Sequence, residues 1–84
     1  MYYVYRLESV SAPQHNYIGY TTDLKIHLRD HNRGKCKATT TLAPWRVTFY
    51  SAFETKALAL EFEKYLKSGS GKAFGNKRLW PSGQ

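Results

Sequence analysis

Two β-forming segments separated by turn residues near the N-terminus constrain the fold more than any other feature of this sequence. Residues 2–10 open on an aromatic run, residues 12–16 read Ala-Pro-Gln-His-Asn, and residues 17–21 resume an aromatic pattern. Aromatic and β-branched side chains favour strands, whereas proline and asparagine favour turns. We therefore predict a β-hairpin over this part of the chain.

The central part of the chain predicts a helix and a third strand. Thr22 or Asp23 can cap a helix over about 23–33, which Gly34 ends. After a polar, threonine-rich loop, residues 45–53 alternate between apolar and polar positions, which predicts a strand. The helix residues expected on one face are Leu24, Leu28 and His31, and the apolar strand positions are Trp45, Val47 and Phe49.

The C-terminal part predicts two more helices. Thr55 can cap a helix through about Lys67, the Ser-Gly-Ser-Gly run at 68–71 breaks it, and a short helix follows over about 72–79. The side chains expected to face inward from the longer helix are Leu58, Ala59, Phe62 and Leu66. The order ββαβαα predicts an α+β fold in which helices flank a small three-stranded antiparallel sheet.

Size and charge narrow the function classes. A chain of 84 residues predicts one domain, over residues 1–80, with a short C-terminal tail at 81–84. The net charge of +7 favours a polyanionic partner, namely DNA, RNA or an anionic membrane. No apolar run is long enough to span a bilayer, and the N-terminus does not resemble a signal peptide. The lone Cys36 fits a reducing compartment, so we expect a cytoplasmic protein with no membrane contact and no obligate protein partner.

Tyrosines and one glutamate are the candidate functional residues. Tyr5 and Tyr17 lie on strands that we expect to pair, and such tyrosines most often serve packing. Gly19 weakens its strand but allows another group to approach closely. Glu63 shares a helix face with apolar residues, where a carboxylate needs a partner or a metal; from spacing alone, an ion pair with Lys67 is favoured.

Two further patterns carry less weight. The Ser-Gly-Ser-Gly-Lys run at 68–72 follows a helix and lacks the hydroxyl residue of a magnesium-binding phosphate loop, although amides of the next helix could hold a phosphate. His27 and His31 are one helical turn apart, a spacing that can bind zinc, but no third ligand is near in sequence.

Taken in order, these residues resemble the GIY-YIG nuclease family, and its small standalone bacterial members in particular. The first motif is present as Tyr3-Val4-Tyr5, with Tyr3 where the family name has glycine, and the second is intact as Tyr17-Ile18-Gly19. The resemblance covers nearly the whole chain. It continues through Thr21, Asp23, Leu24, Leu28, His31, Asn32, Gly34, Pro44-Trp45, Ala59-Leu60, Glu63, Leu66-Lys67 and Asn76.

The resemblance implies metal-dependent cleavage of a nucleic-acid phosphodiester that leaves a 5′-phosphate and a 3′-hydroxyl. Glu63 would bind one divalent ion, Mg²⁺ or alternatively Mn²⁺, and magnesium needs few protein carboxylates because it retains waters. Tyr5 or Tyr17 would activate the attacking water, which requires a phenol pKa below its usual value near 10. Asn76 would orient the phosphate.

The resemblance fails at position 27, where the family has arginine and this chain has His27. Arginine holds a phosphate bidentately and is always charged, whereas histidine is mostly neutral at pH 7. Three interpretations follow: an attenuated enzyme, natural or engineered; an active enzyme that uses His27 as base or protonated clamp; or an inactive nucleic-acid-binding module. We favour the first.

Basic and hydroxyl side chains near the two polar loops are the expected nucleic-acid contacts. They are Lys35, Lys37, Thr39, Thr41, Lys67, Lys72, Lys77 and Arg78. A compact basic groove with exposed aromatic side chains suits single strands, so single-stranded DNA is the first expected substrate and structured DNA the second. A protein-interaction domain that uses the exposed aromatic residues remains a competing class.

Overall fold

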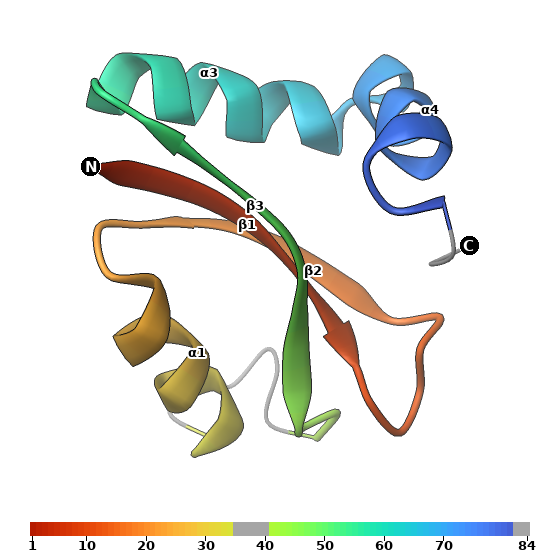
Figure 1. Ribbon diagram of the computed structural model, residues 1–84. Coiled ribbons are helices and arrows are strands. Elements are labelled where there is room, and N and C mark those ends of the chain that lie inside the picture. The colour runs from red at the N-terminus through yellow and green to blue at the C-terminus, as the bar shows by residue number, and fades with distance from the viewer. Residues whose placement is uncertain (35–40, 82–84) are drawn as a thin grey trace.

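The computed structural model describes residues 1–34 and 41–81. Strand β1 (Tyr2–Ser9) lies at the centre of a three-stranded antiparallel sheet, between β2 (Asn16–Thr21) and β3 (Trp45–Phe53). Helix α1 (Leu24–Asn32) covers one face of the sheet, and α3 (Lys56–Lys67) and α4 (Gly69–Arg78) cover the other (Figure 1). The predicted α+β fold and the order ββαβαα are confirmed.

The two faces of the sheet carry separate apolar clusters. Val4 packs with Ala59, Leu66 and Trp80 on the α3 side. Its neighbour Tyr5 packs with Leu7 and Trp45 on the α1 side, together with Leu24 and Leu28. Successive side chains of a strand point to opposite faces, so β1 supplies both clusters and is buried from Val4 to Ser9. A domain this small therefore has two thin apolar layers instead of one thick core.

A β-bulge interrupts the alternation expected in β3. Leu7 pairs with Val47 and Arg6 pairs with Phe49, which leaves Thr48 as the extra residue. As a result, Val47 packs on the α1 side and Phe49 on the α3 side. The expectation that alternation continues from Trp45 through Phe49 was therefore wrong.

The helix ends follow local capping chemistry. Asp23, not Thr22, caps α1 by accepting the Ile26 amide at 3.1 Å, and Thr55 caps α3 by accepting the Leu58 amide at 3.2 Å. Two expectations were wrong. Helix α4 begins at Gly69 and not near residue 72, because Ser68 caps it. Leu58 is 51% exposed, because the buried stripe of α3 is limited to Ala59 and Leu66 with Phe62 half-buried.

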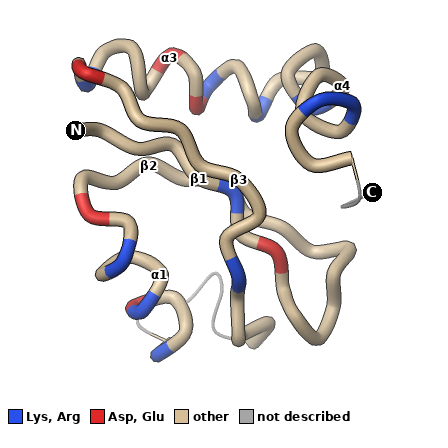
Figure 2. The backbone as a smooth tube through the Cα atoms, in the orientation of Figure 1, with Lys and Arg blue, Asp and Glu red and all other residues tan. Residues whose placement is uncertain are grey.

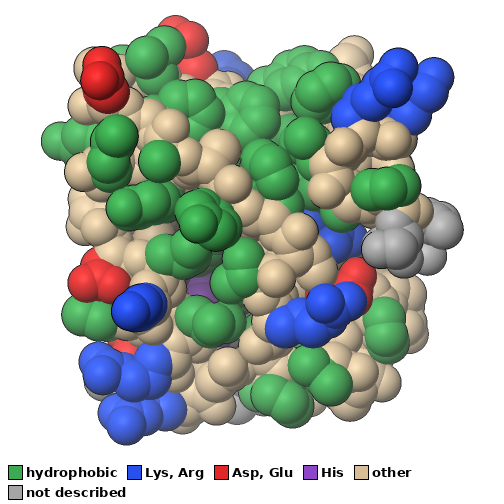
Figure 3. Space-filling view, in the orientation of Figure 1, with side chains coloured by type: hydrophobic (Ala, Val, Ile, Leu, Met, Phe, Trp, Pro, Cys, Tyr) green, Lys and Arg blue, Asp and Glu red, His purple; other side chains and the backbone are tan. Residues whose placement is uncertain are grey.

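Charged residues lie on all three helices and, as Arg6, Glu8 and Arg46, on the sheet. Figure 2 shows Lys and Arg along α1 and α4, and Figure 3 shows hydrophobic side chains between these basic regions on the face in view. Within residues 1–34 and 41–81, no helix has the length and apolar character needed to cross a membrane.

Candidate active site

A buried hydrogen bond between a phenol and an imidazole forms the centre of the candidate site. Tyr5 is 1% exposed, and its Oη lies 3.1 Å from Nε2 of His31, which is also buried. Tyr5 pairs with Gly19 across the hairpin, and a methyl group at Gly19 would overlap the Tyr5 ring. The glycine of the second motif therefore has a specific role here, which is to give the Tyr5 phenol room on the α1 face.

Tyr17 and His27 complete this phenol–imidazole cluster. The ring centroids of Tyr17 and His31 are 5.0 Å apart, and those of Tyr5 and His27 are 5.7 Å apart. Tyr17 and His27 are half-buried, so they are the members that reach toward solvent. The cluster of Tyr5, Tyr17, His27 and His31 thus has two buried members and two at its opening.

Thr21 orients the His27 ring. Its hydroxyl oxygen lies 3.1 Å from His27 Nδ1, accepts the Asp23 amide at 3.1 Å and donates to the Asp23 carbonyl at 3.2 Å. The Thr21 hydroxyl therefore holds the His27 ring through Nδ1 and leaves Nε2 as the ring nitrogen without this contact.

The environment of His31 favours its neutral form. Burial lowers the pKa of His31, the neighbouring His27 lowers it further, and Asp30 acts in the opposite direction. A neutral imidazole at neutral pH can accept the hydrogen of the Tyr5 hydroxyl at Nε2, so the pair needs no net charge to persist.

Glu63 does not join the phenol–imidazole cluster. It lies on α3, across the sheet from α1, and its carboxylate contacts the Lys67 ammonium at 3.1 Å, as the helical spacing indicated. The preceding residue, Phe62, packs against Phe49 and Phe53 of β3. Because successive helix residues are about 100° apart, Glu63 flanks the inner stripe of α3 on the side of β2. The acid and the phenols therefore occupy opposite faces of the sheet and do not form one cluster.

Among the described residues, the partly buried Glu63 carboxylate is the candidate oxygen ligand for a divalent ion. The Glu63 side chain is 20% exposed, so an ion bound there would keep most of its waters, as Mg²⁺ commonly does. Across residues 1–34 and 41–81, no three His, Cys, Asp or Glu side chains form a group that could hold a metal. The described residues are therefore suited to a hydrated divalent ion that a single carboxylate, that of Glu63, would hold.

The other predicted residues lie on α3 and α4, in the turn before β3, or outside the described part of the chain. Lys35, Lys37 and Thr39 fall among residues 35–40 and lie outside the described residues. Exposed side chains belong to Thr41, Lys67, Lys72, Asn76, Lys77 and Arg78. Asn76 accepts a hydrogen bond from Trp80 Nε1 at 2.8 Å and lines a hollow with Lys67 and Lys72.

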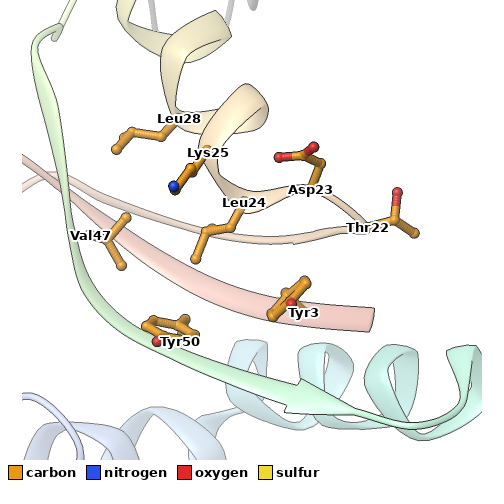
Figure 4. Close-up of a pocket in the computed structure, with 8 residues that line it drawn as sticks. All are labelled: Tyr3, Thr22, Asp23, Leu24, Lys25, Leu28, Val47 and Tyr50. Atoms are coloured by element: carbon orange, nitrogen blue, oxygen red, sulfur yellow. The ribbon is translucent and has the colours of Figure 1, made fainter. Parts of the chain in front are cut away.

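A second, more apolar hollow lies on the α1 face. Its volume is about 520 Å³, and Tyr3 and Tyr50 face Leu24, Lys25 and Leu28 across it (Figure 4). Leu24 and Leu28 also pack against the Tyr5 layer, so this hollow adjoins the layer that holds the phenols. Tyr50 is 57% exposed, which leaves its ring accessible from solvent.

Two side chains that sequence reasoning left out of the site are prominent in the structure. His31 was expected only on the inner face of its helix or as part of a zinc pair, yet it bonds directly to Tyr5. Arg6 is 2% exposed on the central strand. A cation between Tyr5 and Leu7 in an otherwise apolar run was the available signal, because a buried arginine requires dedicated partners.

Comparison with known proteins identifies the family of this chain. The sequence profile of the GIY-YIG catalytic domain matches residues 1–78. The chain belongs to the GIY-YIG family. It therefore has a nuclease-type domain.

Relatives of this GIY-YIG domain occur in bacteria, archaea and a eukaryote. A UPF0213 protein of Streptococcus pyogenes serotype M3 is 41% identical over 66 residues, which cover 77% of this chain and 70% of that protein. A UPF0213 protein of Haloquadratum walsbyi is 35% identical over 68 residues, covering 80% and 74%. The structure-specific endonuclease subunit SLX1 homolog of Giardia intestinalis is 42% identical over 60 residues, covering 67% of this chain and 17% of that protein. The chain thus spans only a small part of the Giardia protein.

Proposed function

We propose that this GIY-YIG domain is a metal-dependent endonuclease that hydrolyses DNA phosphodiesters at the β2 edge of its sheet. The observation that supports this most is the buried Tyr5–His31 hydrogen bond beside the two half-exposed side chains Tyr17 and His27. A buried phenol needs a hydrogen-bond partner in any role, so the feature that favours a site is the second phenol and second imidazole that lie beside this pair and are partly open to solvent.

The two tyrosines have different roles in this proposal. Tyr17 is the more exposed, so it is the one that can meet the attacking water and act as its general base. The resulting hydroxide attacks phosphorus, the bond to the 3′-oxygen breaks, and that oxygen takes a proton from solvent. Tyr5 is too deeply buried to meet the substrate and acts as a positioning residue that holds His31 against the Tyr17 ring.

Glu63 would hold the divalent ion, Mg²⁺ or Mn²⁺, through its carboxylate. When bound, the ion stabilises the charge that develops on the phosphate and on the leaving oxygen. Lys67 contacts the same carboxylate and holds it in place at 3.1 Å.

His27 attenuates this enzyme. Its Nδ1 is bound to Thr21, so only Nε2 can reach a phosphate, whereas arginine would present a charged fork. Removing a fixed cation from such a site costs about 3 kcal/mol of transition-state stabilisation, or roughly two orders of magnitude in rate.

Single-stranded DNA is the preferred substrate in this proposal, and structured DNA is the second choice. The hollow between Tyr3 and Tyr50 is open and lined by aromatic and aliphatic side chains, with Lys25 at its rim. An unpaired base can stack on the exposed Tyr50 ring, whereas a base within a duplex cannot leave its stack without cost.

A nucleic-acid-binding module without catalysis is the second candidate. The observation that favours it is the separation of Glu63 from the phenol–imidazole cluster, together with the Glu63–Lys67 ion pair. In that case, binding would weaken steeply with salt, and cleavage would stay absent even in a His27→Arg variant.

Single-turnover cleavage of a labelled single-stranded oligonucleotide distinguishes these functions. We expect cleavage that requires Mg²⁺ or Mn²⁺, leaves a 5′-phosphate and falls about 100-fold or more in Tyr17→Phe. Tyr65→Phe is the matched control, because Tyr65 is an exposed tyrosine on α3 away from the cluster. Cleavage by Tyr17→Phe at the wild-type rate would refute the assigned role of Tyr17.

A further inference from the structure

We propose that the hollow between the start of β2 and helix α4 binds a second phosphate group of the nucleic-acid strand, with Arg6, Lys67 and Lys72 as its cations. This inference rests on the proposed function only in taking the bound phosphate to be part of a nucleic acid. The hollow lies on the α3 and α4 face, so it is distinct from the phenol–imidazole cluster on the other face.

The buried guanidinium of Arg6 supplies a positive charge that its own partners do not fully balance. Arg6 donates to the Thr48 hydroxyl at 2.8 Å and lies 3.5 Å from the Glu8 carboxylate. The same carboxylate is closer to Arg46, at 2.7 Å. Two guanidinium groups therefore share one carboxylate. Burial lowers the pKa of Arg6, which reflects the cost of keeping this cation out of water.

The lining of the hollow is suited to an anion. Around a volume of about 190 Å³ lie the cations Arg6, Lys67 and Lys72 and the amides of Asn16 and Asn76. No carboxylate is among the described residues that line it, although Lys67 also contacts the Glu63 carboxylate at 3.1 Å and Arg6 lies 3.5 Å from that of Glu8. The volume is several times the roughly 30 Å³ that one water occupies in the liquid, which leaves room for a hydrated phosphate group.

Trp80 fixes two of these lining groups. Its indole Nε1 donates to Asn76 Oδ1 at 2.8 Å, so the Asn76 amide must turn its NH₂ donors away from Trp80. The Arg6 guanidinium lies over the Trp80 ring, 4.8 Å from its centroid. A methyl group at Gly75 would overlap the Trp80 ring. The absence of a side chain at Gly75 therefore makes room for the indole. A preorganised donor set of this kind lowers the entropic cost of holding a phosphate.

Binding can be observed directly through the indole of Trp80. The probes are inorganic phosphate, unphosphorylated thymidine and a thymidine dinucleotide with one phosphodiester, each titrated without divalent ions. In ¹H–¹⁵N spectra we expect the Trp80 indole and Asn76 amide signals to shift with the dinucleotide and not with thymidine. Trp45 lies in the α1-side cluster, so its indole signal is an internal reference.

Lysine variants connect this hollow to strand binding. Lys72→Gln should weaken single-stranded oligonucleotide binding roughly fivefold at moderate salt and reduce the salt slope by about 0.7, the value for one lost phosphate contact. Lys64→Gln is the matched control, because Lys64 is an exposed lysine of α3 outside the hollow. Lys72 is exposed, so this variant should fold even if an Arg6 variant does not.

The outcomes separate this inference from the proposed enzyme function. Trp80 shifts together with a Lys72→Gln defect support the phosphate site even if the wild-type protein cleaves nothing. Shifts with inorganic phosphate alone, or equal binding by Lys72→Gln and Lys64→Gln, would overturn the strand-phosphate site. Cleavage that depends on Tyr17 would still stand in that case.

Discussion

Replacing Gly19 by alanine tests the packing that positions the Tyr5 phenol. Gly19 lies opposite Tyr5 in the hairpin, and an added methyl group would overlap the ring near its hydroxyl end. The Tyr5 ring is 1% exposed and lies against Tyr17, His27 and His31, so it has little room to move aside. We therefore expect Gly19→Ala to displace the ring and break its hydrogen bond to His31.

Two effects contribute to the expected loss of folding stability in Gly19→Ala. Overpacking a well-filled site costs about 1–3 kcal/mol, and loss of a buried hydrogen bond costs about 0.5–1.5 kcal/mol. The free energy of unfolding should fall by roughly 2–4 kcal/mol, a large part of the stability of a domain this small. Urea denaturation followed by circular dichroism measures this difference directly.

Gly69→Ala is the matched control for this experiment. A methyl group at Gly69 meets no heavy atom within 4 Å, so alanine there should leave stability unchanged or raise it by up to about 1 kcal/mol. The double variant Gly19→Ala/Tyr5→Phe should show less than additive loss, because both changes remove the same hydrogen bond. Equal stabilities of Gly19→Ala and Gly69→Ala would refute the proposed contact.

Three other predictions concern charge, the arginine position and base stacking. His31 has a lowered pKa in the folded protein, so the unfolded chain binds more protons than the folded chain below about pH 6.5. The melting temperature should therefore fall as the pH is lowered from that value. A His31→Gln variant should lose the part of this pH dependence that is due to His31. His27→Arg should raise the single-turnover cleavage rate by at least about tenfold through a restored phosphate clamp, and an unchanged rate would show that position 27 contributes nothing to catalysis. Tyr50→Ala should weaken single-stranded DNA binding by about 1–3 kcal/mol in fluorescence anisotropy, whereas equal affinity would exclude stacking in the hollow that Tyr50 lines.

Local patterns predicted most elements of this fold. Trp45–Phe53 was expected as a strand with the bounds it has, since its apolar alternation follows a proline. The start of helix α4 was predicted about three residues later than the observed start at Gly69. The Gly-Ser-Gly segment at its beginning has low helix propensity and depends on the Ser68 cap. The bulge at Thr48 arises from pairing with β1, which no local pattern in β3 reveals.

Side-chain contacts between residues far apart in the sequence were harder to predict. The ion pair of Glu63 follows from helical spacing, but its position across the sheet from Tyr5 depends on how α3 packs. Burial of Arg6 depends on Glu8, Thr48 and Trp80, and two of these three lie far along the chain. The Tyr5–His31 hydrogen bond likewise joins residues that only the packing of α1 brings together.

Divalent-ion titration of the cleavage rate in Glu63→Gln, with Glu61→Gln as control, tests the central assignment most directly. Both residues lie on α3, but Glu61 is exposed and Glu63 flanks the β2 edge. Loss of the Glu63–Lys67 pair changes stability by no more than about 1 kcal/mol, so any large rate effect is not due to unfolding. We predict that Glu63→Gln cleaves DNA at least about 100-fold more slowly at saturating Mg²⁺, while Glu61→Gln matches the wild-type protein. Equal rates in the two variants would contradict a hydrolytic site at this edge of the sheet.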